Sequence, residues 1–253
     1  MQSITNFRDL GGIKNKAGKA VKPRSFLRSG ELSKLSQEQS LQLKKSFHLG
    51  KIIDFRSTKE AKERPDAAVP ETKYVQIDIL ENIHDEGASI EDFIQLGSPE
   101  RAHEYMAKLY GEITLDSVAQ KGYRDFFEEI LTLDDDSSLL FHCFAGKDRT
   151  GIGAALILET LAVPKPAIYT DYLLTNQLRQ QENQALLQQA KAAGLQAEHL
   201  QALAVALDVD SSYLDAFYQT VNDHYGSVDK YLTDALQLDQ DSRQMLQHRF
   251  LTE

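Results

Sequence analysis

The sequence predicts an α/β fold in which a central, mostly parallel sheet is flanked by helices. Short apolar or alternating runs at residues 51–55, 73–79 and 139–141 have the length and the bounding turn signals of strands. Helical patterns separate these runs, and this order is typical of parallel strands joined by crossover helices. From residue 167 onward only helical patterns follow, so we expect a helical C-terminal third. No repeat or clear linker divides residues 1–253, which predicts one domain.

The first 30 residues predict a loop and a small β element, because glycine turn signals surround a strand-like run at residues 25–28. Arg8, Asp9 and Arg28 bring charged groups into this element. They are either ligands of a bound phosphate or a salt-bridged frame behind a phosphate site. We favour the frame.

Polar residues follow the strand predicted at residues 51–55. Sites in open α/β sheets form beyond the carboxyl ends of parallel strands, so we expect Asp54 and Arg56 near the end of strand 139–141. An ion pair of Asp54 with Arg56 or Arg28 is as good a structural hypothesis as a catalytic one. The predicted helices of this half run from Ser33 or Ser36 to about Lys45, and from Thr58 to Arg64.

Residues 81–121 predict several short helices, interrupted near Gly87, Gly97 and Gly111. Their position before the third strand suits a cap or lid over a pocket, and an ordinary packing role is the equal alternative. The His-Asp-Glu run at residues 84–86 has the residue types of a metal site but lacks a useful helical spacing. We therefore expect a solvated loop there and no metal site in the chain.

The later helices are predicted from apolar periodicity. A helix at residues 123–131 precedes the third strand, and the helix at residues 150–161 is almost entirely apolar, which predicts a central position. Gly226 is expected to end one of the C-terminal helices, and the last helix is expected to end near Phe250.

The most informative stretch is Leu139 to Gly153, LLFHCFAGKDRTGIG. A strand, a glycine-containing loop and a helix start follow one another here. Successive backbone N–H groups and the positive end of a helix then point at one place, which predicts an anion site. Cys143, the chain's single cysteine, lies where strand becomes loop. The N–H groups, the helix end and Arg149 favour its thiolate form, so Cys143 is the predicted nucleophile.

Five residues separate Cys143 from Arg149, enough to wrap a tetrahedral oxyanion and to bring a planar guanidinium onto two of its oxygens. His142 is expected to orient the loop from behind. Thr150 is expected to turn its hydroxyl toward the thiolate. The predicted substrate-binding residues are Phe144, Ala145, Gly146, Lys147 and Thr150.

The run HCFAGKDRTG resembles the active-site loop of the cysteine-dependent protein tyrosine phosphatase superfamily, whose signature is His-Cys, five residues, Arg, Ser or Thr, and Gly. Further blocks resemble, in the same order, a microbial branch that includes secreted phosphatases of mycobacteria and Listeria. The resemblance implies a tyrosine-phosphatase-like fold and action on phosphotyrosine and often on phosphoinositides. The blocks are Asn6–Gly12, Arg28–Leu32, Asp54–Ser57, Asp171–Asn176 and Tyr225–Leu232.

The expected reaction is attack of Cys143 on phosphorus, followed by hydrolysis of the phosphocysteine by water. Two aspartates compete to protonate the leaving oxygen. The resemblance to the microbial branch favours Asp148, inside the loop, whereas the wider superfamily would place the acid at Asp78. We favour Asp148 as the acid. The alternative role for Asp148 is to stiffen the loop or to orient Arg149.

Lys147 bears on the substrate. The loop resembles the Cys-x-x-Gly-Lys-x-Arg arrangement of phosphoinositide 3-phosphatases, in which a second cation adds charge for further phosphates. The predicted substrates are therefore phosphotyrosine, with phosphoserine, phosphothreonine and phosphoinositides as further candidates. A solvent-facing lysine is the alternative.

Three other functions compete with a phosphatase. The first is a catalytically silent phosphate-binding module of the same fold. The second is arsenate reductase or sulfurtransferase chemistry, which also uses an anion loop around a cysteine, but the relevant arsenate reductases need further cysteines. The third is a buried structural role for Cys143.

Composition sets further limits. The formal charge of −10 argues against a general nucleic-acid binder, because such proteins need a basic face. One cysteine forbids an internal disulfide, and neither a membrane span nor a signal peptide is recognisable, so we expect a cytoplasmic protein without stable membrane insertion. No cofactor is expected, and the oligomeric state stays open.

Overall fold

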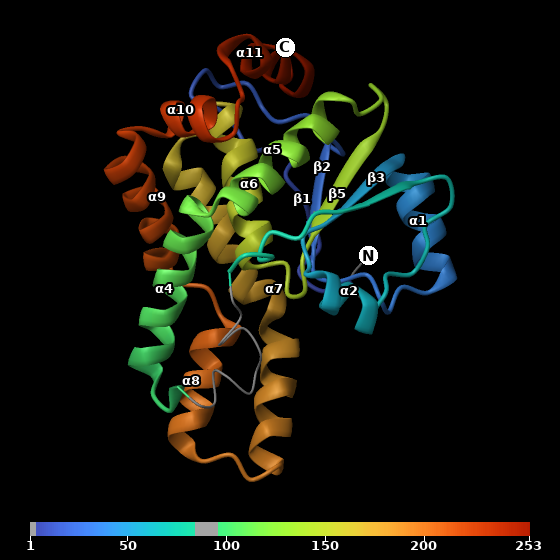
Figure 1. Ribbon diagram of the computed structural model, residues 1–253. Helices are drawn as coiled ribbons and strands as arrows, with labels where there is room; N and C mark the ends of the chain where they lie inside the picture. The colour runs from blue at the N-terminus through green and yellow to red at the C-terminus, as the bar shows by residue number, and fades with distance from the viewer. Residues whose placement is uncertain (1–3, 84–95) are drawn as a thin grey trace.

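The structure, a computed structural model, describes residues 4–83 and 96–253. Its five-stranded sheet has the order β1-β2-β5-β3-β4, and only β1 runs antiparallel to its neighbour. The predicted fold class, a mostly parallel sheet flanked by helices, is confirmed (Figure 1). The strands are β1 Arg8–Asp9, β2 Phe26–Ser29, β3 Leu49–Asp54, β4 Lys73–Gln76 and β5 Ser138–His142.

Each central strand is buried on both faces, and alternate residues belong to different cores. Ile53 of β3 and Phe141 of β5 face the larger core, together with helices α5 (Ser117–Leu131) and α6 (Asp148–Thr160). Ile52 and Leu140, one position earlier, face a smaller core with Leu43 of α1 (Gln37–Phe47). This alternation follows from the two-residue period of a strand, and it explains why the runs are continuously apolar.

Helix α6 occupies the centre of the larger layer of helices, as its apolar sequence predicted. Every residue from Arg149 to Leu158 is buried. Since α6 directly follows β5, the connection between them lies at the carboxyl end of the parallel strands, the edge where sites form in such sheets.

The C-terminal third is helical, as predicted. Helices α7 and α8 extend away from the sheet as a hairpin, and α9 packs beside α4 (Pro99–Leu115) (Figure 1). Gly226 ends α9 with a φ of 78°, and α11 ends at Phe250, so both predicted stops are confirmed. The elements are α7 Lys165–Ala192, α8 Ala197–Leu207, α9 Ser211–Tyr225, α10 Val228–Lys230, a π-helical turn at Tyr231–Ala235 and α11 Gln240–Phe250.

Two predicted helix bounds are wrong. Helix α4 runs through Gly111 without a break, because its buried side chains pack against α9, where a Cβ at position 111 would lie 3.2 Å from Oγ1 of Thr220. Helix α5 begins at Ser117 instead of Tyr123, because the carboxylate of Asp116 accepts hydrogen bonds from the first free N–H groups. Gly87 and the run at 84–86 lie outside the described residues.

Within the described residues, α2 (Thr58–Glu63) completes the set of helices that bear on the site. None of the described helices has the length and apolar character needed to cross a membrane.

Candidate active site

The loop between β5 and α6 turns its carbonyl oxygens toward the rest of the protein. The oxygen of Phe144 accepts a hydrogen bond from the backbone N–H of Glu31 (3.0 Å), and that of Ala145 accepts one from Arg179 (2.9 Å). The oxygen of Gly146 accepts from Asn6 (2.7 Å) and from Arg28 (3.0 Å).

The orientation of these carbonyls fixes the orientation of the N–H groups. The C=O and N–H of one trans peptide point in opposite directions, so the N–H groups of Ala145, Gly146 and Lys147 point away from the carbonyl partners. No acceptor for them lies within residues 4–83 and 96–253. Together with the N-terminus of α6, they form the donor array that an anion requires.

Gly146 is required by geometry. Its φ is +69°, and a Cβ at this position would lie 2.2 Å from the carbonyl oxygen of Ser29. A side chain would therefore push the loop away from β2 and would also strain the backbone.

The salt-bridged frame predicted behind the loop is present. Arg8 and Arg28 both pair with Asp171 of α7, at 2.7 and 2.6 Å, and all three side chains are buried. Burial raises the pKa of Asp171, but Arg28 and Arg8 lower it by more, so the carboxyl stays ionised. Asp9 instead accepts hydrogen bonds from Gly11 and from the backbone of Arg24, so it belongs to a turn.

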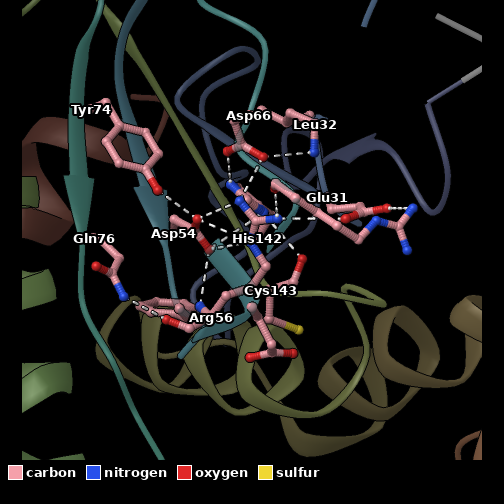
Figure 2. A network of polar contacts seen from close by, with 12 residues as sticks. Glu31, Leu32, Asp54, Arg56, Asp66, Tyr74, Gln76, His142 and Cys143 are labelled. Atoms are coloured by element: carbon pink, nitrogen blue, oxygen red, sulfur yellow. Dashed lines mark hydrogen bonds and ion pairs between the residues drawn. The ribbon is translucent and has the colours of Figure 1, made fainter. Parts of the chain in front are cut away.

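Cys143 lies at the end of β5 and is buried. Figure 2 shows its sulfur projecting away from a group of charged residues behind the strand end. We call these residues, Asp54, Arg56, Asp66 and His142, the Asp54 cluster.

The Asp54 cluster is sealed from solvent. Arg56 pairs with Asp54 (2.7 Å) and with Asp66 (2.8 Å), and its side chain is fully buried. Of the two pairings suggested for Asp54, with Arg56 or with Arg28, the structure forms the one with Arg56. Asp54 also accepts a hydrogen bond from the hydroxyl of Tyr74 at 2.6 Å (Figure 2).

His142 joins this cluster to the loop. Its Nε2 lies 2.8 Å from Asp66, and its Nδ1 lies 3.1 Å from the carbonyl oxygen of Cys143. Burial lowers the pKa of His142, but Asp66 and Asp54 raise it by more, so the net shift is upward. The imidazolium form gives the cluster two positive and two negative charges.

Asp54, Asp66 and His142 also have the residue types of a metal site, with one donor atom of each within 4.8 Å of the others. The guanidinium of Arg56 already donates to both carboxylates. A metal ion would have to displace this fixed positive charge, so the two carboxylates suit the guanidinium of Arg56 better than a metal ion.

Arg149 is held by a residue that sequence reasoning missed. Its two terminal nitrogens contact the two carboxylate oxygens of Glu60 in α2, at 2.6 and 3.0 Å, and Nη1 also donates to the carbonyl of Phe55. Burial lowers the pKa of Arg149, but Glu60, Cys143 and Asp148 raise it by more. Burial likewise raises the pKa of Glu60, and Arg149 lowers it by more. Both groups are charged.

Asp148 is the first residue of α6 and pairs with its neighbour in the loop. Nζ of Lys147 lies 2.9 and 2.8 Å from the two carboxylate oxygens. The hydroxyl of Tyr110 donates to Oδ1 at 3.0 Å. The side chain of Lys147 is only 7% exposed, which excludes a solvent-facing lysine. Glu60, Lys147, Asp148 and Arg149 form what we call the Arg149 cluster.

Asp78, the rival acid, is engaged elsewhere. Its carboxylate accepts hydrogen bonds from the backbone N–H groups of Thr58, at the start of α2, and of Leu80. Thr150 is buried in the first turn of α6. Its Oγ1 has no hydrogen-bond partner among the described residues, so the predicted contact with the Cys143 thiol is not formed.

One of the missed residues carried a weak signal. Ser57 and Glu60 have the spacing of a capping box, and Glu60 does cap α2, while the same carboxylate holds Arg149. Tyr110 lies on a helix whose partners sequence alone does not reveal. Asp66 follows a proline in a loop and gives no signal.

A mostly parallel sheet that carries a cysteine-containing loop between a strand and a helix at its carboxyl edge defines an α/β protein of the open-sheet class. A family model described as "Tyrosine phosphatase family" matches residues 1–252, and the chain belongs to that family.

Two of the relatives cover nearly the whole chain. A protein of Cupriavidus necator, provisionally named a tyrosine-protein phosphatase, is 34% identical over 242 residues, which are 94% of this chain and 83% of the relative. The triple specificity protein phosphatase PtpB of Mycobacterium tuberculosis is 30% identical over 259 aligned residues, 91% of each chain. A tyrosine-protein phosphatase of Nostoc commune is 42% identical over 57 residues, 22% of this chain and 19% of the relative.

Proposed function

We propose that this protein hydrolyses phosphate monoesters through a phosphocysteine intermediate on Cys143. The thiolate attacks phosphorus in line, the P–O bond to the alcohol or phenol breaks, and water then cleaves the P–S bond to release phosphate. The observation that carries the proposal is the loop itself. The carbonyls of residues 144–146 point out of the loop toward the rest of the protein. The N–H groups of the same three peptides have no acceptor among the described residues.

The loop and Arg149 supply the electrostatic part of catalysis. The hydrogen bonds accepted by the carbonyls of residues 144–146 hold these peptides in place. Their N–H groups therefore need no reorganisation when charge develops on the phosphoryl oxygens. Glu60 orients the guanidinium of Arg149, which can offer two parallel N–H groups to a phosphate.

Asp148 supplies the proton in this proposal. As an acid it protonates the leaving oxygen, and as a carboxylate it takes a proton from the attacking water in the second step. Asp78 is less suited to the task, because both of its oxygens accept backbone N–H groups.

Phosphotyrosine is the first proposed substrate, with phosphoserine, phosphothreonine and phosphoinositides as further ones. The similarity to a phosphatase named for triple specificity supports a broad range. Lys147, buried beside Asp148, supplies a second cation next to the anion site.

Release of phosphate from 4-nitrophenyl phosphate tests the proposal. We expect turnover by the native protein, and we expect Cys143→Ser to abolish turnover while phosphate still binds by calorimetry. A native protein that binds phosphate without turnover would instead be the silent binding module. A serine variant with near-normal activity would contradict the phosphocysteine. A panel of phosphotyrosine and phosphoserine peptides and phosphatidylinositol 3-phosphate then ranks the substrates.

A further inference from the structure

Two buried tyrosines stand in line behind Asp148. Tyr110 comes from α4 and Tyr172 from α7, and both side chains are sealed from solvent. The hydroxyl of Tyr110 lies 3.0 Å from Oδ1 of Asp148, and the two hydroxyl oxygens lie 2.7 Å apart. Helices from distant parts of the chain thus bring a chain of two hydroxyls to one carboxyl oxygen.

Both tyrosines keep their protons. Burial raises the pKa of Tyr110 well above its usual value, and the nearby Asp148 raises it further. Burial also raises the pKa of Tyr172 well above its usual value. Each hydroxyl therefore remains a hydrogen-bond donor at any pH at which the protein is folded and active.

The direction of the hydrogen bonds follows from charge. Tyr110 can give its proton to Tyr172 or to Asp148, and an ionised carboxylate is the stronger acceptor. Tyr110 therefore donates to Asp148, and Tyr172 donates to Tyr110. Hydrogen bonds that run in one direction polarise one another, so the second tyrosine strengthens the donation by the first.

This arrangement distinguishes the two oxygens of Asp148. Oδ1 already accepts a hydrogen bond from Tyr110, so a proton that arrives on the carboxyl group goes to Oδ2. The described contact of Oδ2 is with Nζ of Lys147, at 2.8 Å. A bound phosphoryl group would compete for that ammonium and leave Oδ2 open toward the leaving oxygen.

We propose that Tyr110 and Tyr172 are positioning residues that keep Oδ1 of Asp148 as an acceptor and reserve Oδ2 for the catalytic proton. This inference rests on the proposed function, since it assumes that Asp148 is the acid. No proton passes through the tyrosines. The proton on Oδ2 goes to the leaving oxygen in the first step and is replaced from water in the second.

Other charged or titratable groups also face Asp148. Lys147 and Arg149 come from its own loop and helix. Tyr213 of α9 and Tyr123 of α5 also lie close enough to interact with it electrostatically. A change of pH profile alone would therefore not identify the tyrosine pair.

The dependence of rate on the leaving group does identify it. A weakly basic leaving group such as 4-nitrophenolate needs little protonation, whereas phenolate and an alkoxide need much more. We expect Tyr110→Phe to lower kcat/KM, which reports the step that expels the leaving group, about tenfold for phenyl phosphate and less than about twofold for 4-nitrophenyl phosphate, a fraction of the ~10²–10⁴ that a positioned acid contributes. A defect in loop structure would lower both rates alike.

Matched variants complete the experiment. Tyr172→Phe should lower kcat/KM for phenyl phosphate about threefold and change that for 4-nitrophenyl phosphate less. The effect is smaller because Tyr172 acts only through Tyr110. Tyr213→Phe is the control: its ring packs 5.9 Å from that of Tyr110, and its hydroxyl has no hydrogen bond among the described residues, so the leaving-group dependence should not change. Melting temperatures of all three show whether they fold.

The outcomes separate this inference from the proposed function. If Asp148→Asn steepens the leaving-group dependence and Tyr110→Phe does not, the pairing is only structural and the inference is wrong, while the phosphatase mechanism stands. If Asp148→Asn leaves the dependence unchanged although Cys143→Ser is inactive, the acid lies elsewhere and the inference falls with that assignment. A loss of kcat/KM in Tyr110→Phe that is equal for all leaving groups also contradicts it.

Discussion

The two charged clusters at the candidate active site have similar residue compositions and very different surroundings. Each contains two carboxylates and two basic side chains. In the Asp54 cluster no side chain is more than 5% exposed, whereas in the Arg149 cluster exposure reaches 19% for Asp148 and 27% for Glu60. The sealed cluster offers almost no surface at which a ligand could replace its partners, whereas the open one does, and the proposed function has phosphate bind there. The two clusters therefore differ more in solvent exposure than in residue type, which fits a structural role for the Asp54 cluster and the proposed substrate-binding role for the Arg149 cluster.

The sharpest test of this contrast is the same substitution in each cluster. Arg149→Lys removes the planar fork, and we expect kcat/KM to fall about 10²–10³-fold with little change in stability. Arg56→Lys leaves buried carboxylates unsatisfied, and we expect the free energy of unfolding to fall by about 3–5 kcal/mol.

Steady-state kinetics at low temperature, where both variants remain folded, and urea unfolding measure the two effects. If Arg56→Lys loses turnover as severely as Arg149→Lys while remaining as stable as the native protein, the assignment of a structural role to the Asp54 cluster is wrong.

Glu60→Gln probes how firmly the open cluster must hold its arginine. The neutral amide keeps one hydrogen bond to Arg149 but loses the ion pair, so we expect kcat/KM to fall about tenfold, or about 1.4 kcal/mol. Glu63→Gln, an exposed position on the same helix, is the control and should behave as the native protein. Equal activities of the two variants would show that Arg149 is positioned without Glu60.

The sealed cluster should make stability depend on pH through His142. Its pKa is raised in the folded protein, so its stabilising effect is complete below the unfolded value of about 6.5 and is lost as the pH rises through the folded-state pKa. Asp54, Glu60 and Asp171 have lowered pKa values, so their contribution is lost only in acid.

Urea unfolding at a series of pH values from the unfolded-state pKa of about 6.5 upward measures the effect. We expect the free energy of unfolding to decline toward high pH in a Cys143→Ser background, where the thiol cannot contribute. Asp66→Asn should flatten the decline. A slope that survives this substitution would place its origin outside the Asp54 cluster.

The smallest effect is expected at Lys147. Lys147→Met removes one cation from the open cluster, and we expect KM for a phosphotyrosine peptide to rise about threefold and that for phosphatidylinositol 3-phosphate to rise more. Lys62→Met, on the exposed side of α2, is the control. Equal changes for both substrates would remove Lys147 from lipid recognition.

The sequence predicted the parts of the site that lie within one stretch of chain. The strand, loop and helix from Leu139 to Gly153 could be recognised because local periodicity and the Cys-Arg spacing determine them. Glu60 was missed because its spacing from Ser57 indicates only a helix start and gives no sign of the contact with Arg149. Asp66 and Tyr110 were missed because their roles depend on tertiary packing, which also carries α4 through Gly111.

The distribution of the loop's partners along the chain has a consequence for synthesis. The carbonyls of residues 144–146 are bonded by Asn6, Arg28 and Glu31, made early, and by Arg179 of α7, made late. At about 5–20 residues per second, a nascent chain waits several seconds between emergence of the cysteine and emergence of this last partner. Chains released before that moment lack the hydrogen bond from Arg179 to the loop between β5 and α6. We therefore expect incomplete translation products to have no phosphatase activity.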